Sequence, residues 1–270
     1  DYQLALAACL NGVHKIRLNP GNIGGMNRVR EVAAACRDRG IPIRIGVNSG
    51  SLERDIEMRY GSTAEGMTES AMRHIDMLEQ CSFYDICVSL KASDVKKTID
   101  AYRLLHSRCD YPLHLGVTEA GSERMGTIKS AAAFGALLCD GIGDTIRVSL
   151  TADPVQEVRA GRDILRALGM AQEGINLISC PTCGRTQINL IGLAEEVERR
   201  LAGVKTRLTV AVMGCAVNGP GEARGADVGI AGGRGEGILF RHGEIIAKLP
   251  EDKLADALVE EVRRMTGESI

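Results

Sequence analysis

The sequence predicts an α/β protein in which a (β/α) barrel of the TIM type is followed by a smaller α+β domain. Two patterns carry this prediction. From Val13 to about Met170, short runs rich in β-branched residues alternate with amphipathic helical stretches, and alternating βα units imply a parallel sheet with helical crossovers. After Met170 the pattern changes to closely spaced strands with only two helices, which is typical of an α+β domain.

The barrel region has five predicted strands: Val13–Asn19, Ile41–Val47, Asp85–Leu90, Leu113–Thr118 and Thr145–Leu150. Its helices are predicted at Asn27–Arg39, Ala64–Gln80, Asp94–Ser107, Gly126–Cys139 and Val155–Leu168. Gly40, Gly141 and Gly169 fall just past helix ends, where a left-handed residue is favoured. The strand spacing fits a barrel better than a solenoid. An open doubly wound sheet is the alternative, but no glycine-rich dinucleotide turn follows these strands.

Five units are too few to close an eight-stranded barrel. The chain also starts at Asp1, with a helical stretch over Tyr2–Leu10. We therefore expect an incomplete barrel, about five of eight units, and expect about three units to precede residue 1 in a longer, N-terminally truncated parent.

The second domain is expected to cover residues 171–270, after a barrel domain over residues 1–170. Its predicted strands are Ile175–Ser179, Leu208–Met213, Asp227–Ala231, Ile238–Arg241 and Glu244–Leu249, the last two forming a hairpin about His242-Gly243. Its predicted helices are Leu190–Ala202 and Asp252–Met265.

Composition excludes several partner classes. The formal net charge of −2 gives no electrostatic footprint for nucleic acid or an anionic membrane, and three Phe, five Tyr and no Trp offer few platforms for base stacking. No apolar run approaches a membrane span and no signal peptide is visible. The nine cysteines lie mostly singly, which favours free thiols in a reducing cytoplasm over a disulfide scaffold.

Polar side chains occur on strands that should be buried on both faces. They come in pairs that share a face because strand side chains alternate with period two: Arg17 with Asn19, Arg44 with Asn48, Ser89 with Lys91, and Arg147 with Ser149. All lie toward the C-terminal ends of their strands, where barrel active sites are built. Four converging cations would be costly to bury unless an anion such as a phosphate or diphosphate binds them. The alternative is pairing with loop acids such as Glu53 or Asp153.

Glu119 is the only acid among these strand-end residues, and it shares a face with Val117. A carboxylate at this position is a candidate general acid or base.

Three cysteines form a candidate metal site. Cys180 and Cys183 follow a predicted strand, and Cys215 follows another, flanked by Gly214. A [4Fe–4S] cluster accommodates all three, with Glu222 as the nearest oxygen donor. A structural zinc ion stays open but needs a fourth N or S ligand, and a redox dithiol would leave Cys215 unused. The other six cysteines are predicted to be buried, inert thiols: Cys9, Cys36, Cys81, Cys87, Cys109 and Cys139.

Seven segments together resemble one enzyme family, the 4-hydroxy-3-methylbut-2-enyl diphosphate synthases of the non-mevalonate isoprenoid pathway. The resemblance covers nearly the whole chain, and its two cysteine motifs are highly specific. The segments are RLNPGNIG (17–24), RIGVNSGSLE (44–53), KASD (91–94), HLGVTEAG (114–121), IRVSL (146–150), SCPTCGR (179–185) and MGCAVNGPGEA (213–223).

The resemblance implies a barrel followed by an iron–sulfur domain, with a [4Fe–4S] cluster held by Cys180, Cys183, Cys215 and Glu222. It implies reductive ring opening of 2-C-methyl-D-erythritol 2,4-cyclodiphosphate to 4-hydroxy-3-methylbut-2-enyl diphosphate, with two electrons from flavodoxin or ferredoxin. It also implies a homodimer in which the cluster domain of one subunit closes the barrel of the other.

On this basis the catalytic residues are expected to be Glu119, as proton donor, and Glu222. The residues expected to bind substrate are Arg17, Asn19, Arg44, Asn48, Lys91, Arg147 and Ser149. Two rivals stay open from the residues alone: a zinc-stabilised anion-binding protein, and a cluster-free barrel enzyme similar to the pterin synthases.

Overall fold

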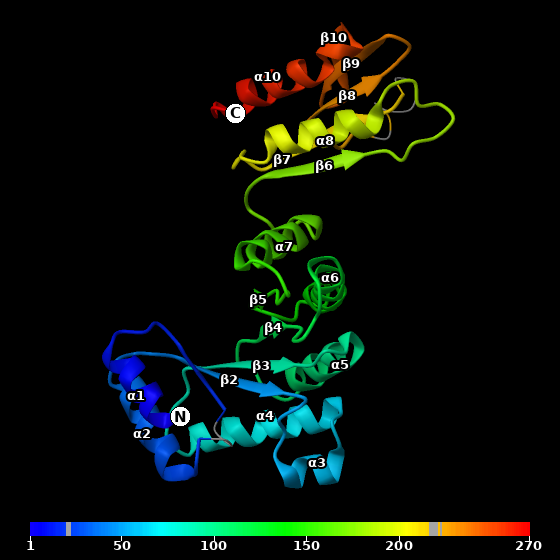
Figure 1. The fold of residues 1–270 in the computed structure, drawn as a ribbon. Helices are drawn as coiled ribbons and strands as arrows, with labels where there is room; N and C mark the ends of the chain where they lie inside the picture. The colour runs from blue at the N-terminus through cyan, green and yellow to red at the C-terminus, as the bar shows by residue number, and fades with distance from the viewer. Residues whose placement is uncertain (20–22, 216–220, 222) are drawn as a thin grey trace. The chain divides into compact units, whose positions relative to one another are not determined.

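The computed structural model describes residues 1–19, 23–215, 221 and 223–270. It divides into two compact units, Asp1–Ile164 and Leu165–Ile270, which are drawn from blue to green and from green to red in Figure 1. No helix in the described part of the chain is both long and apolar enough to cross a membrane.

Unit 1 alternates strands and helices. Its strands are β1 (Ile16–Leu18), β2 (Ile43–Asn48), β3 (Ile86–Lys91), β4 (His114–Gly116) and β5 (Thr145–Arg147). Its helices are α1 (Tyr2–Leu10), α2 (Met26–Arg37), α3 (Arg54–Tyr60), α4 (Ala64–Glu79), α5 (Val95–His106), α6 (Glu123–Cys139) and α7 (Pro154–Ala167), the last of which runs across the division between the units. The five predicted strands and the predicted helices are confirmed. The short helix α3 was not predicted, because seven residues are too few to show a helical period.

The strands of unit 1 pair in parallel and in chain order. Strands β1, β2 and β3 form one sheet and β4 and β5 form another, while a single bridge between Val88 and Leu113 joins β3 to β4. This order is that of a barrel wall. Among the described residues, no ladder connects β5 back to β1.

Local signals explain where the helices begin and end. Asp94 caps α5, its Oδ1 accepting the Lys97 N–H at 2.6 Å, and Thr63 caps α4 through the Gly66 N–H. Gly40, Gly141 and Gly169 have positive φ angles at or just after helix ends, as predicted.

Strand β2 shows how the wall of unit 1 separates apolar from polar residues. Ile43, Ile45 and Val47 are buried and lie on one face, where α4 contributes buried residues such as Ile75 and Leu78. Burying one such side chain contributes about 1.5 to 3 kcal/mol. The alternate positions of the strand carry polar residues or glycine, so the opposite face is left for the site.

In the described residues of unit 2, helices α8 (Leu190–Leu201) and α10 (Leu254–Thr266) pack against a five-stranded sheet. Its strands lie in the order β6 (Ile175–Ser179), β7 (Leu208–Met213), β8 (Val228–Gly232), β9 (Glu236–Arg241) and β10 (Glu244–Pro250). The first three are parallel, and β9 and β10 form the predicted hairpin, with positive φ at His242 and Gly243. Helices α8 and α10 pack on one face of the sheet in a common apolar core, and a short 3-10 turn, η2 (Glu251–Lys253), precedes α10.

One expectation about the thiols is wrong. Cys139, at the end of α6, is exposed, and Cys81 and Cys109 are only half-buried. The amphipathic pattern places a helix in the sequence, but it does not fix the solvent exposure of a residue in the last turn, where the chain leaves the core.

Candidate active site

The register of unit 1 places the strand-end polar residues on one face. Arg17 is the direct partner of Arg44, and Asn48 is the direct partner of Lys91. Arg147 pairs with Gly116 on β4. Because paired residues of parallel strands point to the same side, these side chains share the inner face of the wall. We refer to Arg17, Arg44, Lys91 and Arg147 as the cation cluster.

Two strand glycines let these long side chains cross to the neighbouring strand. A Cβ atom at Gly46 would lie 2.4 Å from Arg17 Nε, and one at Gly116 would lie 2.9 Å from Lys91 Cε. Arg17 Nη2 also donates to the Gly46 carbonyl at 3.1 Å. Sequence reasoning missed both glycines, although a glycine inside a strand is a known signal of close approach.

The cation cluster is electrostatically strained. Lys91 is 9% exposed. Burial, followed by the charges of Arg44, Arg147 and Arg17, lowers the pKa of Lys91 to about 8. Burial and the charge of Arg17 also lower the pKa of Arg44. The cations are therefore close enough to repel one another.

Carboxylates do not neutralise this cluster within the described ranges, where none of its four cations takes part in an ion pair. The two acids considered as partners are engaged elsewhere. Glu53 accepts a hydrogen bond from Ser70 Oγ at 2.7 Å and contacts His74, while Asp153 accepts the Val155 N–H in the first turn of α7. An anion from outside would relieve the repulsion.

Neutral polar groups accompany the cations. Asn19 Oδ1 is buried without a hydrogen-bond partner in the part of the chain that the structure describes. Asn48 and Ser149 are half-buried. The Leu150 N–H donates to Glu157 Oε1 at 2.9 Å, which ties the segment after Ser149 to α7.

His114 belongs to the same inner face but was not predicted as a site residue. It lies two residues before Gly116, and its Nδ1 is 2.8 Å from Thr145 Oγ1. Burial and then the charges of Arg44 and Lys91 lower its pKa to about 4. The imidazole is therefore neutral near pH 7, a hydrogen-bonding group among cations. The sequence could have indicated this, because His114 lies two residues before Gly116 and strand residues at this spacing share a face.

Glu119 follows β4 in an unusual backbone conformation. It is exposed, and its φ angle of +52° lies in the left-handed region that favours glycine. A non-glycine residue held there is one form of backbone strain found at functional sites.

The cysteines of unit 2 collect at one edge of its sheet. Ser179 pairs with Val212, so Cys180 and Cys215 both follow the C-terminal ends of neighbouring parallel strands. The Gly214 N–H donates to Cys180 Sγ at 3.1 Å, and the Gln187 N–H donates to the Gly214 carbonyl at 3.3 Å. The two cysteine motifs are thus in direct contact.

Hydrogen-bond donors also surround the exposed Cys183. The backbone N–H of Arg185, followed by its side chain, lowers the pKa of the Cys183 thiol. A thiolate stabilised in this way is a good metal ligand.

The cysteine edge fits an iron–sulfur group by its chemistry. It combines three thiols with N–H donors that point at sulfur, which is the environment of such clusters. Among the described residues, no three His, Cys, Asp or Glu side chains are close enough to hold a single metal ion, and Glu222 lies outside the described residues. His242, the nearest histidine considered for zinc, follows Arg241, which pairs with Val228 at the opposite end of β8. The register therefore argues against a zinc site that uses His242.

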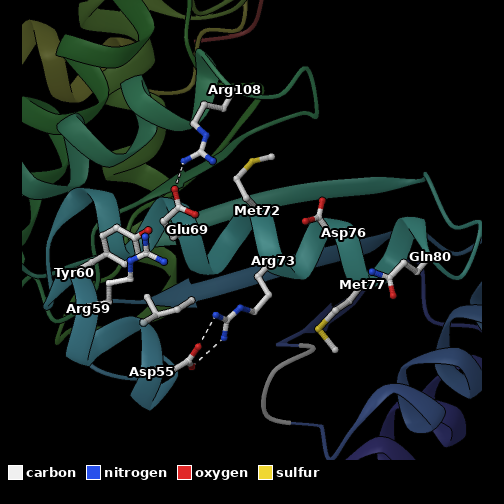
Figure 2. Close-up of a pocket in the computed structure, with 11 residues that line it drawn as sticks. Asp55, Arg59, Tyr60, Glu69, Met72, Arg73, Asp76, Met77, Gln80 and Arg108 are labelled. Atoms are coloured by element: carbon white, nitrogen blue, oxygen red, sulfur yellow. Dashed lines mark hydrogen bonds and ion pairs between the residues drawn. The ribbon is translucent and has the colours of Figure 1, made fainter.

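A groove on the outer helical layer of unit 1 contains two cations that are paired with carboxylates. The groove has a volume of about 430 Å³ and lies between α3 and α4, near Arg108 (Figure 2). Arg73 is bound to Asp55 by two hydrogen bonds of 3.0 and 2.6 Å, and Arg108 Nη1 lies 2.5 Å from Glu69 Oε1. These two cations already have partners.

Comparisons with known proteins match both units. Residues 1–162 match the model described as GcpE TIM-barrel domain, and residues 176–264 match the one described as GcpE protein C-terminal domain.

Curated relatives match nearly the whole chain. A Geobacter sulfurreducens protein named 4-hydroxy-3-methylbut-2-en-1-yl diphosphate synthase (flavodoxin) is 64% identical over 269 residues, which is 99% of this chain and 76% of the relative. Proteins of the same name from Ruminiclostridium cellulolyticum and Clostridium perfringens are 58% and 57% identical, over 98% and 96% of this chain and 75% and 74% of their own lengths. The chain thus spans about three quarters of each relative.

Proposed function

The chain belongs to the GcpE family, and from that premise we propose that it catalyses the reductive ring opening of 2-C-methyl-D-erythritol 2,4-cyclodiphosphate. The product is 4-hydroxy-3-methylbut-2-enyl diphosphate, as the names of its relatives indicate. Family membership supports this oxidoreductase activity and gives no support to a zinc-stabilised binding protein or a pterin-synthase-like enzyme.

The cation cluster is the observation that carries the substrate assignment. Four cations share the inner face of one parallel wall, and no carboxylate pairs with them in the described ranges. A cyclic diphosphate supplies the missing negative charge, and arginine offers the paired donors that phosphate oxygens prefer.

Each inner-face residue then has a proposed role. Arg17, Arg44, Lys91 and Arg147 bind the diphosphate oxygens. Asn19, Asn48 and Ser149 are neutral hydrogen-bonding groups that orient the substrate, and the buried Asn19 Oδ1 gains a partner when substrate hydroxyls arrive.

The reaction opens a ring C–O bond and releases one oxygen as water, so it consumes two electrons and two protons. Glu119 is the proposed proton donor, because it follows the inner-face strand β4 and its carboxyl group is exposed.

The proposed cofactor is a [4Fe–4S] cluster held by Cys180, Cys183, Cys215 and Glu222. When bound, such a cluster supplies single-electron transfer and an iron site open to a substrate oxygen. The protein contributes the Gly214 N–H as a hydrogen-bond donor to Cys180 Sγ, and the Arg185 donors that lower the pKa of the Cys183 thiol.

Further assignments belong to the same proposal. Flavodoxin is the proposed electron donor, since it stands in the names of the relatives, with ferredoxin as the alternative. We also propose a homodimer, a barrel domain over residues 1–170 that holds about five of eight units, and a cluster domain over residues 171–270.

Anaerobic purification followed by iron, sulfide and zinc analysis tests the proposal, together with turnover of the cyclic diphosphate by reduced flavodoxin. We expect about four iron and four sulfide per chain, with product formation. Stoichiometric zinc without sulfide, or a loaded cluster without turnover, would contradict the assignment.

A further inference from the structure

Strands β3 and β4 are joined by the bridge between Val88 and Leu113, and a side chain stands where the next direct backbone hydrogen bond is expected. The Val88 N–H donates to the Pro112 carbonyl at 2.8 Å, so the next rung of a parallel ladder would join the Leu90 N–H to the His114 carbonyl. Instead, Leu90 N–H donates to the Tyr102 hydroxyl at 3.1 Å, and that hydroxyl donates to His114 O at 2.5 Å. A side-chain oxygen therefore occupies one rung of the wall.

The interruption is local, since the two strands meet again beyond it. The Thr118 N–H donates to the Ala92 carbonyl at 3.2 Å. In place of one direct bond from Leu90 to His114, two hydrogen bonds run through the Tyr102 hydroxyl. The backbones of β3 and β4 are therefore held further apart here than in a regular ladder.

Tyr102 is well placed to hold this gap open. It lies on α5 with 0% of its surface exposed. Helix α5 is fixed at the end of β3, because Asp94 caps its first turn and Thr98 Oγ1 donates to the Ala92 and Asp94 carbonyls. Burial raises the pKa of Tyr102, so its hydroxyl stays protonated and serves as donor and acceptor together.

The gap lies directly beneath two inner-face residues. Lys91 follows Leu90, and His114 supplies the carbonyl that Tyr102 binds. The Lys91 side chain crosses this same gap to lie over Gly116, where even a methyl group would be too close. The spacing of β3 and β4 therefore decides where the ammonium group sits.

We propose that Tyr102 is a positioning residue whose hydroxyl sets the strand separation that places Lys91 in the cation cluster. The inference rests on the proposed function only in treating that cluster as the diphosphate site. Tyr102 contacts no substrate in this scheme, and it acts through the two backbones.

The test is Tyr102→Phe, which removes one oxygen from a residue of otherwise unchanged shape. Tyr111→Phe is the control, because it removes a tyrosine hydroxyl that is likewise hydrogen-bonded, to Glu79 Oε1 at 2.8 Å, but away from the inner face. Binding of inorganic diphosphate to each anaerobically purified full chain is measured by calorimetry across the pH range in which Lys91 titrates.

For Tyr102→Phe we expect about tenfold weaker diphosphate binding, the scale of one or two lost hydrogen bonds. We also expect the midpoint of its pH dependence to move upward from about 8, because a displaced Lys91 regains solvent. Tyr111→Phe should change neither quantity, even where thermal stability falls equally in both variants. Equal binding and an equal midpoint in the two variants would overturn the inference.

Gly116→Ala is a second test, used if Tyr102→Phe does not fold. It places a methyl group on β4 beside the Lys91 side chain. Its methyl group should displace Lys91 and reproduce both changes, whereas binding like that of the wild type would overturn the positioning claim. Turnover of the cyclic diphosphate by the wild type is scored separately. Its absence would contradict the proposed function and leave the comparison of diphosphate binding intact.

Discussion

The inner face of unit 1 and the cysteine edge of unit 2 both lie at strand ends, but their functional residues are held in place differently. Both gather functional residues at the C-terminal ends of parallel strands. In unit 1 most of these residues lie on the strands, where ladder register fixes them before any ligand arrives. In unit 2, Cys183 and Cys215 lie in loops beyond the strands, and no metal-holding group is assembled among the described residues. The first site is therefore preformed, whereas we expect the second to be completed by the proposed cofactor.

The largest effect is expected at the cysteine edge. Cys215→Ser should lose the cluster and lower turnover by about a thousandfold or more, because it removes one of the three thiolates proposed to hold the iron. Iron and sulfide analysis with a turnover assay measures this. Cys139→Ser, which alters an exposed thiol in unit 1, is the control and should keep both. Full turnover by the Cys215→Ser protein would contradict the proposal that a cluster bound by Cys215 is needed for catalysis.

Glu119→Gly separates chemistry from stability at the inner face. Turnover should fall about a hundredfold, the scale of a lost general acid. Glycine also relieves the φ of +52°, so the free energy of unfolding should rise by about 1 kcal/mol. Ser82→Gly, with φ +55° in a turn after α4, is the control and should stabilise without loss of activity. Denaturant unfolding and kinetics report the two quantities, and full activity in Glu119→Gly would refute its role as proton donor.

Lys91→Met tests whether the repulsion among the four cations lowers the stability of the fold. Loss of one charged contact should weaken diphosphate binding about thirtyfold. Because the cation is buried beside three others, its removal should raise the melting temperature. Lys96→Met, which removes an exposed lysine paired with Asp100, should leave diphosphate affinity unchanged. A lower melting temperature for Lys91→Met would show that the cluster is not strained.

The pH dependence gives the smallest effect. Lys91 has a folded pKa of about 8 against an ordinary value of 10.5, so it loses its charge in the fold as pH rises through 8. Diphosphate affinity should therefore fall roughly tenfold between pH 7 and 9. Between pH 8 and 10.5 the unfolded chain binds more protons, so the unliganded protein should become more stable as pH rises in that window.

Lys91→Arg provides the check, because arginine stays charged throughout this range and should flatten the affinity profile. A profile that is equally steep in Lys91→Arg would assign the titration to another group.

The contrast between strand and loop residues also explains which features of the two sites could be predicted from the sequence. Alternation predicted which polar residues of one strand share a face, and the ladder register aligns these faces between strands, with Arg17 beside Arg44 and Asn48 beside Lys91. Residue spacing predicted the cysteine motifs but not the distances between sulfurs, which depend on loops.

Other features depend on tertiary contacts that no local pattern reports. The Tyr102 hydroxyl enters a ladder between two strands from a helix, so no spacing along the chain marks it. The exposure of Cys139 was mispredicted for the same reason, since it depends on what packs at the end of α6.

Diphosphate binding to the Cys215→Ser protein tests the central claim most directly. We expect strand register alone to build the anion site of unit 1, without help from the cysteine edge. Calorimetry should then give an affinity for inorganic diphosphate equal to that of the cluster-loaded wild type. If the Cys215→Ser protein loses diphosphate binding together with the cluster, the anion site is not preformed and depends on the cysteine edge.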